Sequence, residues 1–96
     1  MSHAVVVMYD APRDLDAWMH GPHYEEVLAT PGVTEVRRYE VSVGPEGCRK
    51  YLAIIETDDL DATLRWRDGD AGQRSQEEAD RRGVANRYAL VCKRIY

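Results

Sequence analysis

The chain has 96 residues, of which 44% are hydrophobic and 31% are charged, and its formal net charge is −4. A chain of this length predicts a single domain, 1–96, whose modest core a partner subunit would extend. The acidic balance argues against nucleic acid as a partner, because binding to the phosphate backbone needs a basic surface. The hydrophobic run at 4–8 is too short to cross a bilayer. We therefore expect no membrane association and a cytoplasmic protein, with Cys48 and Cys92 as reduced thiols.

The first third of the chain predicts a strand followed by two helical segments. Residues 3–9 are apolar at both odd and even positions, which is typical of a central strand covered on both faces. Pro12 ends this strand, and we expect Asp14 to cap a helix that Gly21-Pro22 interrupts. Pro22 suits the first position of the next helical segment, which should end at Pro31-Gly32.

The rest of the chain predicts two strands, a helical region and a last strand. Residues 33–43 and 49–57 are rich in β-branched and aromatic residues and are separated by a turn at 44–47. Asp58-Asp59 should open a helix that weakens near 68–72. Residues 73–82 mix both signs of charge at helical spacing, which predicts a solvated helix, and residues 84–95 predict the last strand.

This order of elements predicts an α+β fold of the ferredoxin-like βαββαβ type, an antiparallel four-stranded sheet with its helices on one face. The other face would lack a cover. The residues that we expect there are too apolar to stay in water, namely Tyr9, Tyr51, Tyr88, Val7, Ile55 and Leu90. A large exposed apolar face indicates an interface. We therefore expect a second copy to cover it, forming a homodimeric α+β barrel.

The segment 8–32 carries a resemblance to a known family. Its matching residues are Tyr9-Asp10-Ala11-Pro12, Asp14, Trp18, His23 and the Pro31-Gly32 pair eight and nine residues after that histidine. With Tyr51-Leu52 and Gly72-Gln73 further along, the chain resembles the EthD-like family of the dimeric α/β-barrel superfamily. It departs from the family at Asp10, where Asn is common, and at Trp18-Met19, where two adjacent aromatic residues are frequent.

The resemblance implies a homodimer with a pocket between sheet and helices in each subunit. It does not imply one reaction, because the superfamily includes cofactor-free monooxygenases, polyketide cyclases, isomerases and haem enzymes.

His23 and Asp10 are the candidates for catalysis. The imidazole of His23 can accept or donate a proton near neutral pH, and a helix start at Pro22 favours its neutral form. Alternatively, His23 hydrogen-bonds to a strand carbonyl and fixes the helix. Asp10 could act as a base with a raised pKa beside apolar walls. Its alternative role is to cap the loop that follows it.

Several aromatic and basic residues are candidates for substrate contact: Tyr9, Trp18, His20, Tyr24, Arg38, Tyr51, Trp66 and Tyr88. The aromatic residues could equally fill the core or the dimer interface. Arg37 and Arg38 should point to opposite faces of their strand. One could bind a carboxylate or enolate oxygen, but we favour a solvated or inter-subunit ion pair. His20 and His23 lack a third ligand and are separated by Gly21-Pro22, so we predict no metal site. Haem binding through either histidine is a minor alternative.

The leading interpretation is a homodimeric enzyme without a cofactor, of the cyclase, isomerase or monooxygenase type. It would act on a hydrophobic, aromatic or polyketide-like small molecule by proton transfer assisted by His23. In the alternative interpretation, the protein is a non-catalytic ligand-binding or accessory protein of a catabolic or secondary-metabolite pathway.

Overall fold

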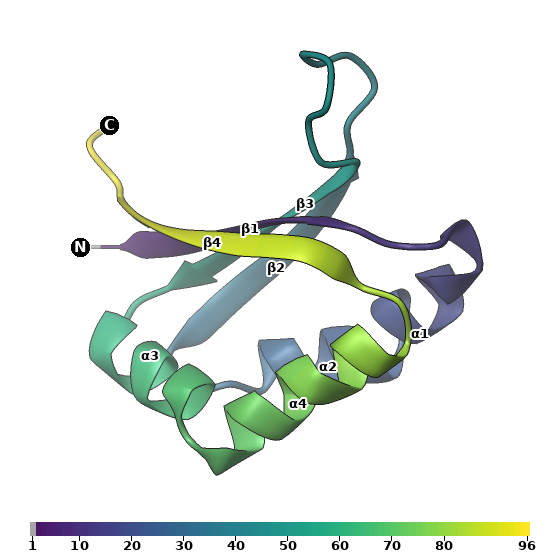
Figure 1. Ribbon diagram of the computed structural model, residues 1–96. Helices are drawn as coiled ribbons and strands as arrows, with labels where there is room; N and C mark the ends of the chain where they lie inside the picture. Colours follow the sequence, from purple (N-terminus) through teal and green to yellow (C-terminus); the bar gives the residue numbers. More distant parts are fainter. Residues whose placement is uncertain (1) are drawn as a thin grey trace.

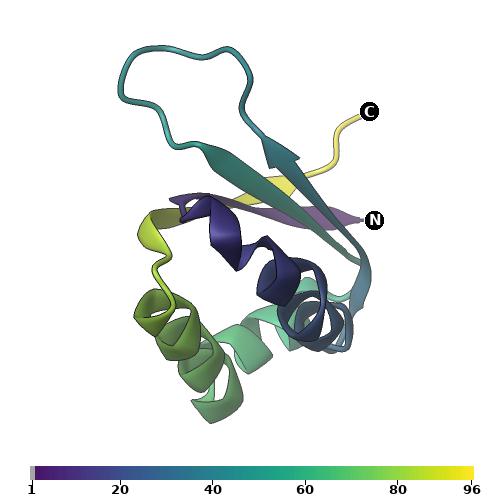
Figure 2. The same cartoon turned by 90° about the vertical axis from the view of Figure 1, so that its right-hand side faces the viewer.

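The computed structural model describes residues 2–96. Four strands form one antiparallel sheet in the order β2-β3-β1-β4, and all helices lie on one side of it (Figures 1 and 2). The elements in chain order are β1 (His3–Asp10), the 3-10 helix η1 (Arg13–Leu15), α1 (Asp16–His20), α2 (Pro22–Leu28), β2 (Val33–Glu40), β3 (Tyr51–Thr57), α3 (Leu60–Asp68), α4 (Asp70–Arg81) and β4 (Ala85–Lys93). The predicted ferredoxin-like α+β architecture is confirmed.

The helix starts follow local sequence, with one exception. Pro22 is the first residue of α2, where its missing N–H costs no hydrogen bond. Asp59 caps α3, because its Oδ1 accepts a hydrogen bond of 3.1 Å from the backbone N–H of Ala62. The prediction that Asp14 caps the first helix is wrong. Asp14 lies inside η1, and Pro12 occupies the capping position without a side-chain hydrogen bond.

The strand register shows which side chains face the helices. In β1 and β3, Val5 pairs with Ile55, Val7 with Ala53 and Tyr9 with Tyr51, and paired residues point to the same side of a sheet. Tyr9 and Tyr51 are only 2% and 5% exposed. The expectation that Tyr9, Tyr51, Val7 and Ile55 lie on the uncovered face is therefore wrong. They face the helices, and the error arose because both sets of alternate residues in β1 are apolar.

The opposite set of alternate residues forms the face that no helix covers, which we call the open face. Its apolar members, paired across β1, β3 and β4, are Val6, Met8, Leu52, Ile54, Tyr88 and Leu90. Tyr88 and Leu90 are 42% and 50% exposed. The β2–β3 loop, 41–50, rises on the same side of the sheet as this face (Figure 1).

Helix α4 is less solvated than the charge pattern predicted. Gly72, Ser75 and Ala79 are buried along one side of it, and the Ser75 hydroxyl donates a hydrogen bond to Glu26 of α2. The prediction missed this buried side because its residues are small or polar rather than large and apolar. α4 is therefore one wall of the interior and not only a surface helix.

Candidate functional site

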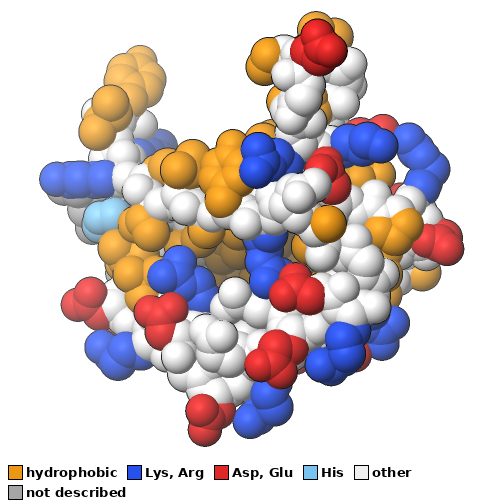
Figure 3. All heavy atoms as spheres, in the orientation of Figure 1, with side chains coloured by type: hydrophobic (Ala, Val, Ile, Leu, Met, Phe, Trp, Pro, Cys, Tyr) orange, Lys and Arg blue, Asp and Glu red, His pale blue; other side chains and the backbone are white. Residues whose placement is uncertain are grey.

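A cavity of about 430 Å³ lies between the sheet and the helices. This volume falls within the range of small-molecule sites. The hollow is visible between β4 and α4 in Figure 3, with hydrophobic side chains at its base. The sheet lines it with small and branched apolar side chains, namely Val5, Val7, Val36, Ala53, Ile55 and Ala89. The interior of the cavity is therefore mostly apolar on the side of the sheet.

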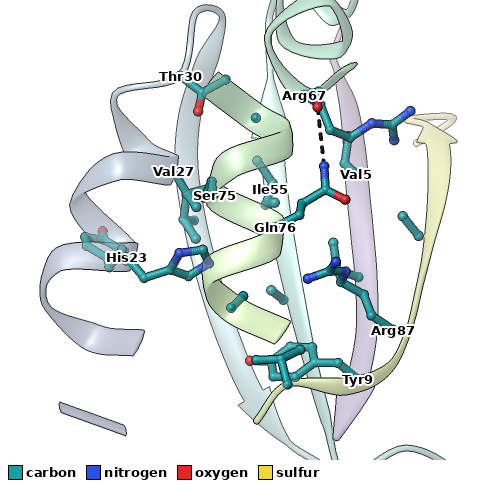
Figure 4. Close-up of a pocket in the computed structure, with 18 of the residues that line it drawn as sticks. Val5, Tyr9, His23, Val27, Thr30, Ile55, Arg67, Ser75, Gln76 and Arg87 are labelled. Carbon is teal, nitrogen blue, oxygen red and sulfur yellow. Dashed lines mark hydrogen bonds between the residues drawn. The ribbon is translucent and has the colours of Figure 1, made fainter. Parts of the chain in front are cut away.

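His23 reaches into the cavity from the first turn of α2 (Figure 4). Its ring stacks on Trp18, with 4.5 Å between ring centroids and 21° between planes. The Nδ1 atom is buried and has no hydrogen-bond partner within residues 2–96, so the alternative in which this nitrogen anchors the helix to a strand is not supported. Burial is the main cause that lowers the pKa of His23 below its ordinary value of 6.5. The imidazole is therefore neutral near pH 7 and can accept a proton.

The lowered pKa of His23 predicts a pH dependence of stability. Well above pH 6.5 the imidazole is neutral in both the folded and the unfolded chain. As the pH falls below 6.5, the unfolded chain binds a proton that the folded protein resists, so the free energy of unfolding decreases until the pH reaches the folded-state pKa. Urea unfolding across this window should show a steeper loss in the wild type than in His23→Gln. Equal slopes in the two proteins would contradict the burial of a neutral imidazole.

Arg38 organises the end of the cavity that lies near α1. Its Nε donates a hydrogen bond of 2.5 Å to the Tyr9 hydroxyl, and its Nη1 lies 2.8 Å from Asp16 Oδ1 and 2.9 Å from His20 Nε2. The guanidinium also lies over the Tyr51 ring, 4.4 Å from the centroid. Arg37, by contrast, pairs with Glu56 on the open face. The two arginines point to opposite faces as predicted, and Arg38 forms an ion pair within the subunit.

The other predicted site residues occupy three kinds of position: some line the cavity, two stack on residues that line it, and one lies on the open face. The cavity is lined by Tyr9, His20, Tyr24, Arg38 and Trp66, in addition to His23. Trp18 and Tyr51 are not among the lining residues. Trp18 stacks on His23, and Tyr51 stacks on Tyr9 at a centroid distance of 5.7 Å. Tyr88 lies on the open face, away from the cavity.

Asp10 does not have the properties of the predicted base. Its carboxylate accepts 2.9 Å hydrogen bonds from the Asn86 side chain and from the backbone N–H of Lys50. These two interactions, with that of Asn86 the larger, lower its pKa, whereas the prediction required a raised pKa. Within residues 2–96, the Asp10 carboxylate also accepts no hydrogen bond from the loop that follows it, so the capping role is not found either. Asp10 joins the ends of β3 and β4, so we correct both interpretations.

Several polar residues of the cavity were not predicted from the sequence. Arg87, Ser75 and Gln76 line it from β4 and α4. Ser75 and Gln76 were missed because the pattern of α4 indicated a solvated helix. Arg87 lies in a strand, and only its alternation with Tyr88 could have placed it on the helix side.

Among residues 2–96, no three His, Cys, Asp or Glu side chains come together as a metal ion would require. No helix in the described chain has the length and hydrophobicity needed to span a membrane.

No protein-family model and no curated protein sequence matches the chain. Solved structures do match. An EthD family protein from Bacillus halodurans has a TM-score of 0.69 at 16% identity, covering 99% of this chain and 100% of its own. A dimeric ferredoxin-like protein of unknown function from Jannaschia has a TM-score of 0.68 at 16% identity, covering 98% and 100%.

A third similar structure is SnoaB, a cofactor-independent oxygenase from Streptomyces nogalater. Its TM-score is 0.70 at 11% identity, and the match covers 97% of this chain and 92% of that chain. At these identities the likeness concerns the fold. The chain therefore has the ferredoxin-like fold of the EthD-like dimeric α/β-barrel proteins.

Proposed function

We propose that the protein is a homodimeric enzyme that works without a cofactor and transfers a proton to or from a hydrophobic, aromatic or polyketide-like molecule. The observation that carries this proposal is the position of His23, which lines an apolar cavity of about 430 Å³ with its Nδ1 atom buried and with its pKa lowered by that burial. The apolar walls of such a cavity can hold a ring system and limit its contact with water, while His23 supplies a group for general acid–base chemistry.

Proton abstraction is a first step that cyclases, isomerases and cofactor-independent oxygenases can share. A neutral imidazole accepts a proton from an acidic C–H or O–H group, and the substrate becomes an enolate or phenolate. Trp18 stacks on His23 and limits the orientations of the ring. Arg38 and Tyr9 provide N–H and O–H groups in the same cavity. The protein shares its fold with a cofactor-independent oxygenase, which supports the proposal that it works without a cofactor.

The homodimer is part of the proposal because the open face carries apolar side chains at high exposure, among them Leu90 at 50%. The similar Jannaschia protein is described as dimeric. A sheet-to-sheet dimer would bury this face and leave the cavity of each subunit on the far side of its own sheet. A cytoplasmic location is also part of the proposal, and the two free cysteines, Cys48 and Cys92, support it.

Deuterium exchange into anthrone tests the proposed catalysis. Anthrone is a flat tricyclic ketone with acidic benzylic hydrogens, and its exchange in D₂O without oxygen can be followed by proton NMR. We expect the wild type to accelerate exchange and His23→Ala to lose about 100-fold or more of that acceleration. His3→Ala is the matched control, because His3 is not among the residues that line the cavity.

Equal exchange in His23→Ala and His3→Ala would refute the catalytic role of His23. Saturable binding of anthrone without any accelerated exchange would instead favour the alternative, a ligand-binding or accessory protein.

A further inference from the structure

The side chains that line the cavity differ in charge from the rest of the protein. The chain carries a formal net charge of −4, yet the lining includes three arginines, Arg38, Arg67 and Arg87, and a single carboxylate, Asp68. Asp68 pairs with its neighbour Arg67 at 3.2 Å. Positive groups in a cavity with apolar walls favour an anionic ligand, because the low-dielectric walls strengthen their field.

The three arginines are not equally free to bind a ligand. Arg38 is engaged through Nε and Nη1 by Tyr9, Asp16 and His20 and is stacked on Tyr51, so that within residues 2–96 only its buried Nη2 lacks a hydrogen-bond partner. Arg67 pairs with the adjacent residue near the surface. Arg87 is held through one nitrogen alone: Nη2 lies 3.1 Å from Oδ1 and 3.4 Å from Oδ2 of Asp80. Among residues 2–96, no other acceptor hydrogen-bonds to Arg87, which leaves most of its five N–H donors for a ligand.

The backbone directs Arg87 into the cavity. The pairing of β4 with β1 shifts between Met8 and Asp10, and Asn86, directly before Arg87, has a φ of 56°. This irregularity is a β-bulge, a feature common beside binding sites because it reorients side chains. Figure 4 shows Arg87 entering the cavity from β4 and His23 entering it from α2, on the opposite side.

Asp80 is well placed to release Arg87. Its side chain is 56% exposed, whereas that of Arg87 is 24% exposed. Water can therefore solvate the carboxylate of Asp80 when a ligand takes over the guanidinium, and an ion pair with one solvent-exposed partner contributes little to stability. A planar carboxylate or an enolate oxygen can accept two N–H bonds from the fork of an arginine.

We propose that Arg87 is the anion-binding residue of the cavity, and that the ligand is a flat aromatic molecule with one ionised oxygen group, a carboxylate or an enolate, directed toward β4. This inference rests on the proposed function for its chemical setting, because an enolate is the species that proton abstraction by His23 creates. Arg87 would then stabilise the negative charge on the substrate oxygen while His23 holds the proton.

Two fluorescent probes of nearly equal shape, anthracene-2-carboxylate and anthracene-2-carboxamide, test the inference by titration of the folded protein. We expect the wild type to bind the carboxylate about 10-fold or more tightly than the amide. Arg87→Gln should abolish this preference while amide binding stays within about twofold. Arg81→Gln, which removes the same charge from an exposed position on α4, should retain the preference.

Asp80→Asn gives an independent measurement in which Arg87 remains in place. Loss of the competing carboxylate should tighten carboxylate binding several-fold and leave amide binding unchanged. A carboxylate preference that survives in Arg87→Gln, or is weakened in Asp80→Asn, would overturn the assignment.

The titrations are separable from the test of catalysis. A charge preference that depends on Arg87, in a protein that does not accelerate exchange of anthrone, would support this inference and refute the proposed function. Exchange that depends on His23, together with a carboxylate preference that Arg87→Gln does not change, would support the proposed function and refute this inference.

Discussion

Gly32→Ala is expected to destabilise the protein by about 4 kcal/mol. A domain of this size has a total stability of roughly 5–14 kcal/mol. The variant should therefore lose a large part of it and unfold at a temperature lower by roughly 15 °C or more.

Two separate costs combine at Gly32. Its φ is +87°, a conformation that costs an L-residue roughly 1–2 kcal/mol. A Cβ there would also lie 2.6 Å from the carbonyl oxygen of Asp59 and 2.9 Å from the hydroxyl oxygens of Thr57 and Thr63. These atoms cannot easily move, because the two threonine hydroxyls are 2.7 Å apart and Thr57 also hydrogen-bonds to the Gly32 carbonyl. Together they attach the start of β2 to the start of α3.

Gly47→Ala separates the two costs. Gly47 also has a positive φ, of 79°, but a Cβ there would meet no atom within 4 Å. We expect this variant to lose only the conformational part, roughly 1–2 kcal/mol. Urea unfolding followed by circular dichroism gives both values. If the two variants lost equal stability, the tight contact around Gly32 would not be a determinant of the fold.

The type and order of the elements could be predicted from sequence because the signals are local. Pro and Gly residues mark the ends of the strands and helices, as at Pro22 and Gly69, and valine-rich runs mark the strands. The bounds differ by a few residues. β2 ends at Glu40 rather than residue 43, and β3 begins at Tyr51 rather than residue 49.

The composition of the site could be predicted only in part, because it depends on which face of the sheet the helices cover. β1 is apolar at both alternate sets of positions, so its pattern alone could not place Tyr9 on the helix side. The role of Asp10 depends on Asn86 and Lys50, which are distant in sequence. Arg87 was missed for the same reason, since its distance from residues 8–32 in the chain hides its place opposite His23.

Leu90→Asp is expected to convert the proposed homodimer into a monomer at micromolar concentration. Leu90 pairs with Val6 on the open face and is 50% exposed in the isolated subunit. If two copies of the sheet pack through this face, the substitution buries a carboxylate in an apolar interface, which costs several kcal/mol. Native mass spectrometry of freshly purified protein measures the subunit number directly. Leu28→Asp, on the outer side of α2 at 37% exposure, is the control and should remain dimeric.

The apolar pattern of β1 links the oligomeric state to the reason why this strand is apolar on both faces. Its apolar residues at both alternate sets of positions predict a strand that is covered on both faces, but the helices of one subunit cover only the side of Val5 and Val7. Val6 and Met8 face the open side and need a second layer to be buried. A monomeric wild type would contradict the homodimer and leave the apolar even positions of β1 without a structural reason. Leu90 of β4 pairs with Val6 of β1. A dimer that Leu90→Asp dissociates would therefore indicate that β1 contributes both to the floor of the cavity and to the contact between subunits.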